Sequence, residues 1–274
     1  NNDTIKTAAG TFIMKRVINP LLLNELFQER KFSLLEPSSV NLTISENDAM
    51  FLESAQTHYL STGLSSLQNI IEIMSLAQKE RNSIERILDF PSGWARELRF
   101  IKAYFPDAEI TAGDIENDAL EFCRQTFKTN TLISKENFSE ISREKKFDLI
   151  WCGSLFTHIN KIRFRRLLEF FIDSLKDKGL LVFTTLSLPA FGKLLSIEKS
   201  HGLNKLSMFN LLISYSLSGY GYKQYPEQSS YGISMSKPSW IKKTLNQYSR
   251  LKLLSYRQMN WTGLQDVVGC IKIN

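Results

Sequence analysis

Cysteine and histidine are both scarce in this sequence. Its 274 residues include three cysteines, Cys123, Cys152 and Cys270, and three histidines. The cysteines lie far apart, form no C-x-x-C pair and show no ligand-like spacing with the histidines, so neither a disulfide framework nor a metal site is expected. Reduced thiols of this kind are typical of a cytoplasmic protein.

Long apolar runs are also missing. No run approaches the length that spans a bilayer, and no charged start is followed by a compact apolar segment and a cleavage site. Secretion and membrane insertion are therefore not expected. Because the sequence starts at Asn1 without a methionine, we expect either a trimmed chain or a piece of a longer polypeptide with a further fused domain.

Hydrophobic residues make up 43% of the chain, enough for one large domain or for one domain with a smaller appendage. The formal net charge is +6, and from Ser187 onward eleven Lys or Arg accompany only three Asp or Glu. This basic region could meet nucleic acid or an acidic acceptor, or could be a solvated lysine surface. Because the charges are scattered singly, a nucleic-acid partner is not expected.

Apolar strand-like segments alternate with helix-like segments in the middle of the chain. The predicted strands are 85–90, 108–115, 131–133, 147–153 and 179–185, and the predicted helices are 65–81, 94–105, 118–127 and 163–175. This alternation predicts an α/β fold with a Rossmann-like doubly wound sheet, preceded by a helical segment. Beyond it we expect a helical region at 190–217, a Tyr- and Gly-rich loop at 218–232, a helix from Lys237, and apolar stretches at 251–256 and 266–273.

The first strand of this series ends in an acid, Asp89, followed by Pro91, Ser92 and Gly93. In a parallel sheet, ligands bind beyond the carboxyl ends of the strands, and a glycine there lets backbone amides approach a ligand closely. One glycine does not make the G-x-G-x-x-G pattern of a pyrophosphate loop. Asp114 ends the next strand and could accept hydrogen bonds from two ribose hydroxyls, which predicts a nucleoside cofactor.

The ordered motifs from Tyr59 to Thr185 resemble those of the class I S-adenosylmethionine-dependent methyltransferases. The family's first motif is an acid followed by x-G-x-G-x-G, and here it reads D-F-P-S-G-W-A, with Gly93 as its one remaining glycine. The resemblance implies a class I methyltransferase domain over 65–274, mostly parallel with a C-terminal antiparallel strand. It also implies an N-terminal helical cap at 1–64 and an acceptor-side insertion at 187–235.

The same resemblance implies S-adenosylmethionine as the cofactor and a set of residues that contact it. These are Tyr59, Gly63, Asp89, Phe90, Pro91, Ser92, Gly93, Asp114, Ile115, Asn137, Phe138, Gly153 and Ser154. Tyr59 and Gly63, just ahead of the helix at 65–81, would close over the methionine end, although Tyr59 could equally pack. Asn137 could equally cap a turn, and alanine at position 95 would add only a methyl group near the cofactor.

A hydroxyl acceptor must lose a proton when it is methylated, and His158, just after the fourth strand, is the candidate catalytic base. It could also merely form a hydrogen bond or pack. No aspartate cluster lies around 147–158, so no metal is expected. The candidate acceptor-binding residues pair flat rings with polar groups, although they could instead seal the last strands; they are Tyr231, Trp261, Gln265 and Asp266.

Together these features predict O-methylation of a small molecule or glycan hydroxyl. RNA methylation is one alternative, but no Asn/Asp-Pro-Pro-Tyr motif follows the fourth strand, where Gly-Ser-Leu-Phe stands instead. A non-catalytic scaffold that keeps the fold is another alternative, and the altered glycine loop favours it.

Overall fold

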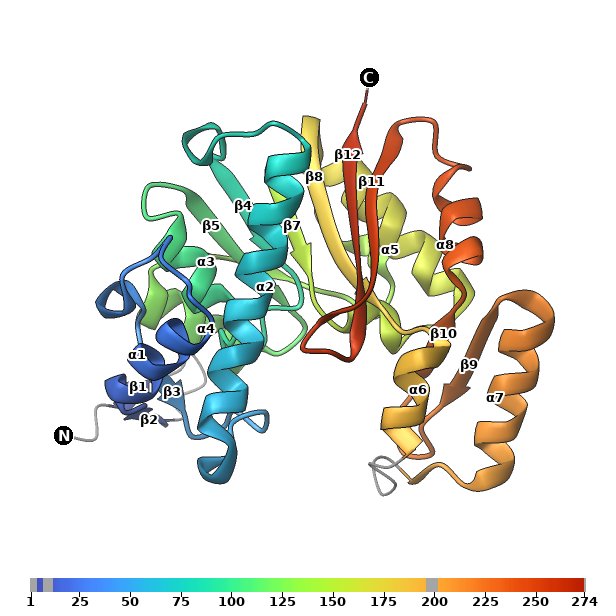
Figure 1. The fold of residues 1–274 in the computed structure, drawn as a ribbon, viewed down its shortest axis with the longest axis horizontal. Helices are drawn as coiled ribbons and strands as arrows, with labels where there is room; N and C mark the ends of the chain where they lie inside the picture. The colour runs from blue at the N-terminus through green and yellow to red at the C-terminus, as the bar shows by residue number, and fades with distance from the viewer. Residues whose placement is uncertain (1–3, 7–11, 196–201, 274) are drawn as a thin grey trace. The chain divides into compact units, whose positions relative to one another are not determined.

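The computed structural model describes residues 4–6, 12–195 and 202–273 (Figure 1). Seven strands make a mixed, mostly parallel sheet, and they are divided between two compact units. The first unit is drawn from residues 1–68 and 80–134, and the second from residues 69–79 and 135–274. The predicted α/β fold class is confirmed.

The sequence predicted a helical N-terminal segment, but this part of the first unit contains strands as well as a helix. Its elements are β1 (Thr4–Lys6), β2 (Phe12–Val17), α1 (Pro20–Glu29), β3 (Thr43–Ser45) and the short 3-10 turns Pro37–Ser39 and Glu53–Ala55. The three strands are antiparallel in the order β1-β2-β3. Strands of three to six residues give too short an alternation to be recognised from sequence.

Helix α2 (Gln56–Leu76) begins nine residues before the predicted start at position 65. The apolar spacing continues upstream through Leu60 and Leu64, both buried, so the early turns have a face to pack. Gly63 is therefore a helical residue. A Cβ there would lie 2.4 Å from the carbonyl oxygen of Arg96, so the glycine permits close packing of the helix.

The parallel strands of the first unit are β4 (Arg86–Asp89), β5 (Glu109–Asp114) and β6 (Asn130–Ile133), with α3 (Leu98–Tyr104) and α4 (Asn117–Phe127) between them. β4 pairs with β5 and β5 with β6, all parallel. Asp89 lies opposite Ala112 and Asp114 opposite Ile133. The two acids thus end neighbouring strands at the same edge. Helix α3 starts later than predicted, because residues 90–97 form a turn.

The strands of the second unit follow the order β7-β8-β12-β11. They are β7 (Phe147–Cys152), β8 (Leu175–Thr185), β11 (Leu251–Trp261) and β12 (Gln265–Lys272), with helices α5 (Lys161–Ser174) and α8 (Pro238–Leu245). β7 and β8 are parallel, whereas β12 is antiparallel to both β8 and β11. The expected antiparallel strand at the C-terminal end is therefore present, as a pair.

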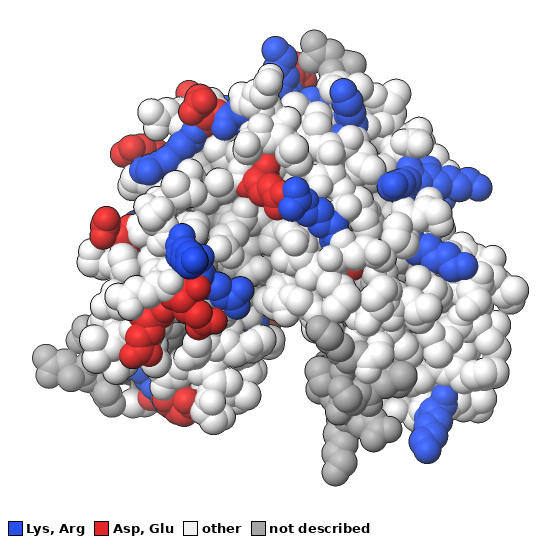
Figure 2. Space-filling model, viewed as in Figure 1, with Lys and Arg blue, Asp and Glu red and all other residues white. Residues whose placement is uncertain are grey.

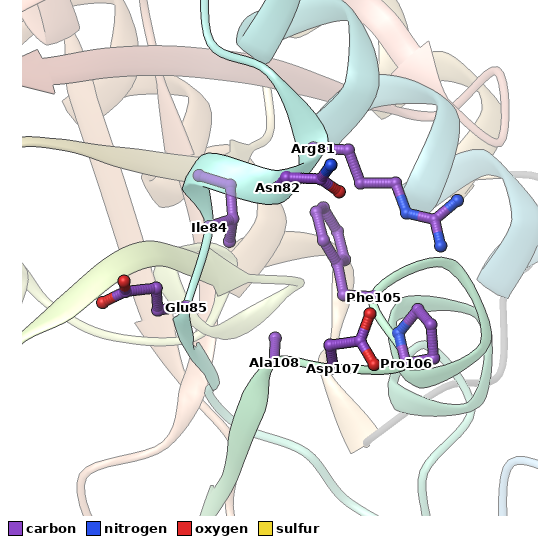
Figure 3. A pocket seen from close by; sticks show the side chains of 8 residues that line it. All are labelled: Arg81, Asn82, Ile84, Glu85, Phe105, Pro106, Asp107 and Ala108. Atoms are coloured by element: carbon purple, nitrogen blue, oxygen red, sulfur yellow. The ribbon is translucent and has the colours of Figure 1, made fainter.

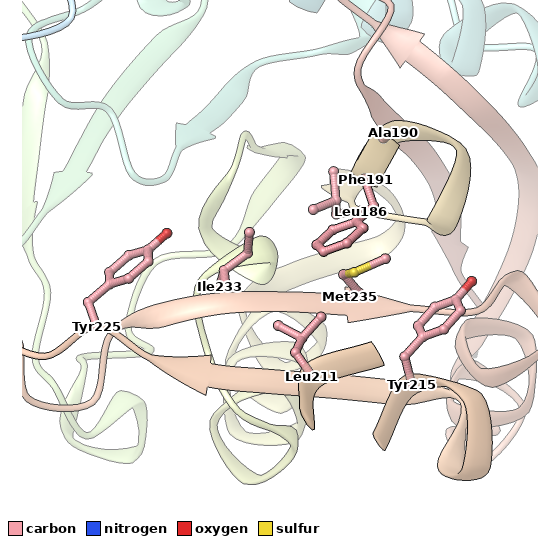
Figure 4. Close-up of a cluster of buried hydrophobic side chains, with 8 residues drawn as sticks. All are labelled: Leu186, Ala190, Phe191, Leu211, Tyr215, Tyr225, Ile233 and Met235. Atoms are coloured by element: carbon pink, nitrogen blue, oxygen red, sulfur yellow. The ribbon is translucent and has the colours of Figure 1, made fainter. Parts of the chain in front are cut away.

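The region predicted as an acceptor-side insertion builds its own small core. It contains α6 (Leu188–Leu195), α7 (Lys205–Ser218), β9 (Tyr220–Gln224) and β10 (Gly232–Ser236). The core residues, drawn in Figure 4, are Leu186, Ala190, Phe191, Leu211, Tyr215, Tyr225, Ile233 and Met235. The prediction of a loop at 218–232 was wrong in its first half, where β9 forms an antiparallel hairpin with β10. Part of the predicted helical region, residues 196–201, lies outside the described residues.

None of the helices in the described ranges combines the length and the apolarity that a membrane crossing requires.

Candidate functional site

The turn after β4 is tied directly to the end of β5. The backbone amide of Ser92 donates to the carbonyl of Gly113 at 2.9 Å, and the amide of Gly93 donates to Oδ2 of Asp114 at 2.8 Å. Gly93 has a φ of +48°, in the left-handed region that glycine adopts freely. The two motifs that the sequence suggested are therefore brought together within the first unit.

Asp114 has the capacity to hold a ribose. Its Oδ1 accepts from the amide of Glu116 at 3.0 Å and its Oδ2 from the amide of Gly93, and the amide of Ile115 also interacts with the carboxylate, so part of its acceptor capacity remains. The side chain is 8% exposed, and burial raises the pKa of this carboxyl. Two hydroxyl donors would complete the hydrogen bonding of the carboxylate.

Asp89 is completely buried, and neither of its oxygens has a hydrogen-bond partner among the described residues. Burial raises the pKa of Asp89 well above its ordinary value, and the negative charges of Glu97 and Asp114 raise it further. A buried acceptor without a donor is costly. The fold therefore keeps an unsatisfied acid beside the turn, as expected of a residue that serves a ligand.

The remaining residues of the turn show where space is available. Phe90 is buried and packs where Gly113 lacks a side chain, and the Phe90–Pro91 peptide bond is cis. A Cβ at Gly93 would meet no described atom within 4 Å, so open space faces the glycine. Ala95 is buried with a φ of +68°. Its departure from glycine therefore costs backbone strain, and the expectation of a mere extra methyl group near the cofactor was wrong.

Ile115 and Tyr59 differ sharply in exposure. Ile115, next to Asp114, is 55% exposed and offers an apolar surface suited to an aromatic base. Tyr59 is 1% exposed, and its hydroxyl donates to Oδ2 of Asp48 at 2.6 Å. These surroundings are those of a tyrosine that packs inside the fold, the second of the two roles that the sequence allowed for Tyr59. Contact with the cofactor stays a prediction for Ile115 and Gly63.

In the second unit, Asn137 caps a 3-10 turn, Phe138–Glu140. Its Oδ1 accepts from the amide of Ser139 at 3.3 Å, and its Nδ2 donates to Glu140 at 2.8 Å. Phe138 is buried beneath the guanidinium of Arg163, 4.8 Å from the ring centroid. Asn137 thus caps a turn, as one of the two interpretations of the sequence had it. Contacts of Asn137 and Phe138 with the cofactor stay predictions.

The end of β7 is held by a polar network. The backbone amide of Ser154 donates to Oγ1 of Thr184 at 2.7 Å, and the side-chain Nε2 of Gln265 donates to Oγ of Ser154 at 3.0 Å. Thr184 in turn donates to Oε1 of Gln265 at 2.6 Å. At Gly153, a Cβ would lie 3.1 Å from Nε1 of Trp151. Ser154 and Gln265 were predicted for different ligands, and the structure joins them.

His158 is fixed by the hairpin of the insertion. Its Nδ1 lies 2.7 Å from the carbonyl oxygen of Gly232, and its ring stacks on Tyr231 at 4.6 Å between centroids with 14° between planes. A carbonyl only accepts, so Nδ1 carries the proton. In the neutral ring the lone pair therefore sits on Nε2, the arrangement that a general base requires.

The predicted acceptor residues divide into buried and exposed ones. Asp266 is completely buried and accepts from Tyr256 Oη at 2.5 Å and from the amide of Met259 at 2.9 Å. Trp261 is 3% exposed and packs edge-on against Trp151. Both residues have the surroundings of the sealing alternative, because no open surface remains to them. Tyr231, at 36% exposed, keeps surface for an acceptor.

A cavity of about 180 Å³ opens elsewhere in the first unit (Figure 3). Its lining residues are Arg81, Asn82, Ile84, Glu85, Phe105, Pro106, Asp107 and Ala108. These residues precede β4 and β5, so the cavity lies at the opposite strand ends from Asp89 and Asp114. It contains none of the predicted site residues. Within the described ranges, no group of three or more His, Cys, Asp or Glu is arranged to hold a metal ion.

Comparisons with known proteins bear on the same segment. Residues 88–181 match the family model of a methyltransferase domain. Malonyl-[acyl-carrier protein] O-methyltransferase of Acetivibrio thermocellus is 27% identical over 133 residues, which make up 46% of this chain and 43% of that protein. The match thus spans less than half the length of that relative.

Solved structures share the fold at low sequence identity. An S-adenosylmethionine-dependent methyltransferase from Clostridium acetobutylicum has a TM-score of 0.51 and 15% identity, over 79% of this chain and 92% of that one. CalS10, an amino pentose methyltransferase from Micromonospora echinaspora solved with S-adenosylmethionine bound, has a TM-score of 0.52 and 12% identity, over 81% and 98%. These likenesses agree with the predicted sheet.

Proposed function

We infer that this chain, which carries a class I S-adenosylmethionine-dependent methyltransferase domain, methylates a hydroxyl group of a small molecule or glycan. The observation that carries the inference is the pairing of Asp114 with the amide of Gly93 at the carboxyl ends of β4 and β5. That pairing lies within residues 88–181, the segment that matches the family model.

Four features of the first unit suit the cofactor. Asp114 keeps acceptor capacity for two ribose hydroxyls, and Ile115 offers an exposed apolar face for adenine. Gly93 faces open space, and Asp89 offers unpaired acceptors. When bound, S-adenosylmethionine supplies an electrophilic methyl group. The contribution of the chain is to orient that group and to exclude water from it.

His158 would serve the acceptor. Its Nε2 takes the proton of the acceptor hydroxyl while Nδ1 keeps its own proton and donates it in a hydrogen bond to the Gly232 carbonyl, so the imidazolium that forms stays oriented. Tyr231, stacked on the imidazole and partly exposed, would present a flat surface to a sugar or aromatic acceptor. The relative from Acetivibrio thermocellus is named an O-methyltransferase, which supports oxygen as the acceptor atom.

The distribution of charge supports a small acceptor over RNA. In Figure 2, the Lys and Arg side chains over α7 and α8 lie singly, separated by uncharged surface. A nucleic-acid surface would gather them into a continuous stripe. We further propose a cytoplasmic location and the predicted division into a cap at 1–64 and a methyltransferase domain at 65–274.

The test is methyl transfer itself. The chain would be incubated with S-adenosylmethionine labelled on the methyl group, together with saccharides, other hydroxylated small compounds, or an RNA mixture. We expect label on a hydroxyl of a member of the first two groups. Label entering RNA alone would replace the proposed acceptor by the alternative, and cofactor binding without transfer to any acceptor would favour the scaffold.

A further inference from the structure

The turn that carries Gly93 contains a second residue in the left-handed region, and it is not a glycine. Ala95 has a φ of +68° and is completely buried. This conformation costs a residue with a Cβ about 1–3 kcal/mol, and it persists only where the surroundings impose it. The hydrogen bond from the Ala95 amide to the Ser92 carbonyl, at 3.0 Å, lies within the turn itself. The restraint must come from elsewhere.

Arg99 supplies that restraint from two atoms. Its backbone amide donates to the carbonyl of Ala95 at 3.3 Å, and its side-chain Nε donates to the same oxygen at 3.0 Å. Two donors on one carbonyl oxygen fix the plane of the peptide bond that follows Ala95. That plane sets the ψ of Ala95, and the left-handed region requires a matching ψ beside the positive φ, so the arginine restrains one of the two dihedral angles of the strained residue.

The other end of the guanidinium is anchored in the N-terminal segment. Nη1 of Arg99 donates to the carbonyls of Asn41, at 2.8 Å, and Thr43, at 3.1 Å, while Nη2 lies 3.3 Å from the hydroxyl of Tyr59. The residue is 1% exposed. Burying a guanidinium is expensive unless its donors are used, and here they bind three separate segments of the chain. Those segments are β3 with its approach, helix α2 and the turn.

We propose that Arg99 is a positioning residue for the cofactor turn: it holds Ala95 left-handed, and thereby sets where Gly93 presents its amide to Asp114. By the same contacts, residues 41–43 of the N-terminal segment become part of the machinery that shapes the turn. The proposal rests on the proposed function, since the turn matters for binding only if it receives the cofactor. Arg99 and residues 41–43 act on the turn and do not themselves touch the cofactor.

The test uses relief of strain at Ala95. Arg99→Met removes the guanidinium donors, so S-adenosylhomocysteine should bind about tenfold more weakly in a calorimetric titration. Ala95→Gly in the same chain should restore the affinity to within about threefold of wild type, because glycine adopts this φ without a restraint. The double variant is compared with Ala95→Gly alone, so that any direct effect of the alanine on binding is taken into account.

Lys128→Gly is the matched control. Lys128 is exposed, follows the last residue of α4 with a φ of +57°, and lies outside the turn at 90–97. In the Arg99→Met background it should relieve the same kind of strain and raise thermal stability, yet leave the affinity low. If Lys128→Gly restored binding as well as Ala95→Gly does, Arg99 would act through general stability, and the proposal would be overturned. Unchanged affinity in folded Arg99→Met would overturn it too.

Two further measurements keep the proposal testable. If Arg99→Met does not fold, Arg99→Lys keeps the charge but cannot reproduce the Nε hydrogen bond, and the same rescue pattern is expected. If the wild-type chain binds no S-adenosylhomocysteine, the proposed function fails, while hydrogen exchange of residues 90–100 still tests Arg99. Exchange there should be faster in the Arg99 variant and slowed by Ala95→Gly but not by Lys128→Gly; any other pattern overturns the role.

Discussion

Asp89 in the first unit and Asp266 in the second are both completely buried next to strand ends, yet only Asp266 has hydrogen-bond partners. The same contrast extends to their neighbours. Asp114 keeps acceptor positions to spare, whereas Ser154 and Gln265 bind one another. The fold thus leaves Asp89 at the end of β4 without a donor among the described residues, whereas it supplies donors to Asp266 on β12.

The contrast teaches how to separate binding residues from sealing residues. A buried acid without a donor and a strained alanine both destabilise the fold, and such features cluster at functional sites. Asp266, like Asp114, accepts one hydrogen bond on each oxygen, but it is completely buried and so presents no surface to a ligand. On this basis we propose the strand ends of the first unit as the cofactor site, and His158 and Tyr231 in the second unit as the residues that meet the acceptor.

The largest expected effect is the loss of turnover on substitution of His158, which tests the acceptor residues of the second unit. His158→Ala should lower turnover by about 10²–10⁴-fold, the usual contribution of a positioned general base, because Nε2 is lost. Cofactor affinity should stay near that of wild type. Turnover and calorimetry on one preparation would measure both. His58→Ala is the control, since His58 is exposed on α2; a normal rate in folded His158→Ala would require another base.

The next largest effect concerns the spare acceptors of Asp114. Asp114→Ala removes two charge-assisted hydrogen bonds to the ribose, each about 1.5–3 kcal/mol in gross terms, and should weaken binding of S-adenosylhomocysteine by about 100-fold or more. Glu116→Ala removes an exposed acid from the same loop and should bind as wild type does. Equal affinities for the two variants would break the assignment of Asp114.

A third prediction tests the unpaired acid directly. Asp89→Asn should raise the free energy of unfolding by about 1–3 kcal/mol near neutral pH, because it removes the cost of protonating or burying an acid that has no hydrogen-bond partner among the described residues. The raised pKa of Asp89 means that the folded state binds its proton more tightly than the unfolded state does. The contribution of the Asp89 carboxyl to the free energy of unfolding is therefore fully present below its pKa in the unfolded state. It is lost as the pH rises from there through its pKa in the folded state.

The measurement for Asp89 is the melting temperature of both proteins against pH. The gap between Asp89→Asn and wild type should widen as the pH rises, and the variant should bind the cofactor more weakly, a trade of function for stability. A wild-type protein more stable than the variant at every pH would show that Asp89 has partners after all.

The smallest effect belongs to the paired acid. Tyr256→Phe removes the phenol that donates to Asp266 and should lower the free energy of unfolding by about 1–2 kcal/mol. Turnover per folded molecule should not change, because both residues seal the last strands. Thermal melts and rates would show this, and a selective loss of acceptor affinity would move Asp266 back among the acceptor-binding residues.

Sequence periodicity predicted the central strands well because their apolar runs are continuous. The predictions at 85–90, 108–115 and 147–153 agree with β4, β5 and β7 to within two residues. The hairpin of β9 and β10 escaped because Tyr and Gly in one stretch read as a turn, although tyrosine also favours strands.

The candidate site was predictable in part for a similar reason. Asp89 and Asp114 end predicted strands and Gly93 lies in the turn after the first, so their positions in sequence place them at the sheet edge. Arg99 was missed because an arginine in an amphipathic helix reads as a solvent-facing residue. Its partners, Asn41, Thr43 and Tyr59, lie 40 or more residues away, and no local pattern reports a contact at that distance. The strain at Ala95 is likewise a property of the folded backbone.

The most direct test of the central claim is a calorimetric titration of the chain with S-adenosylhomocysteine, run beside two glycine variants. Gly93 and Gly192 both have open space where a Cβ would lie, but only Gly93 has a positive φ and faces the Asp114 turn. We expect one equivalent to bind to wild type and to Gly192→Val, and binding to be lost in Gly93→Val. A folded wild-type chain that binds no S-adenosylhomocysteine, or a Gly93→Val chain that binds it as wild type does, would contradict the account.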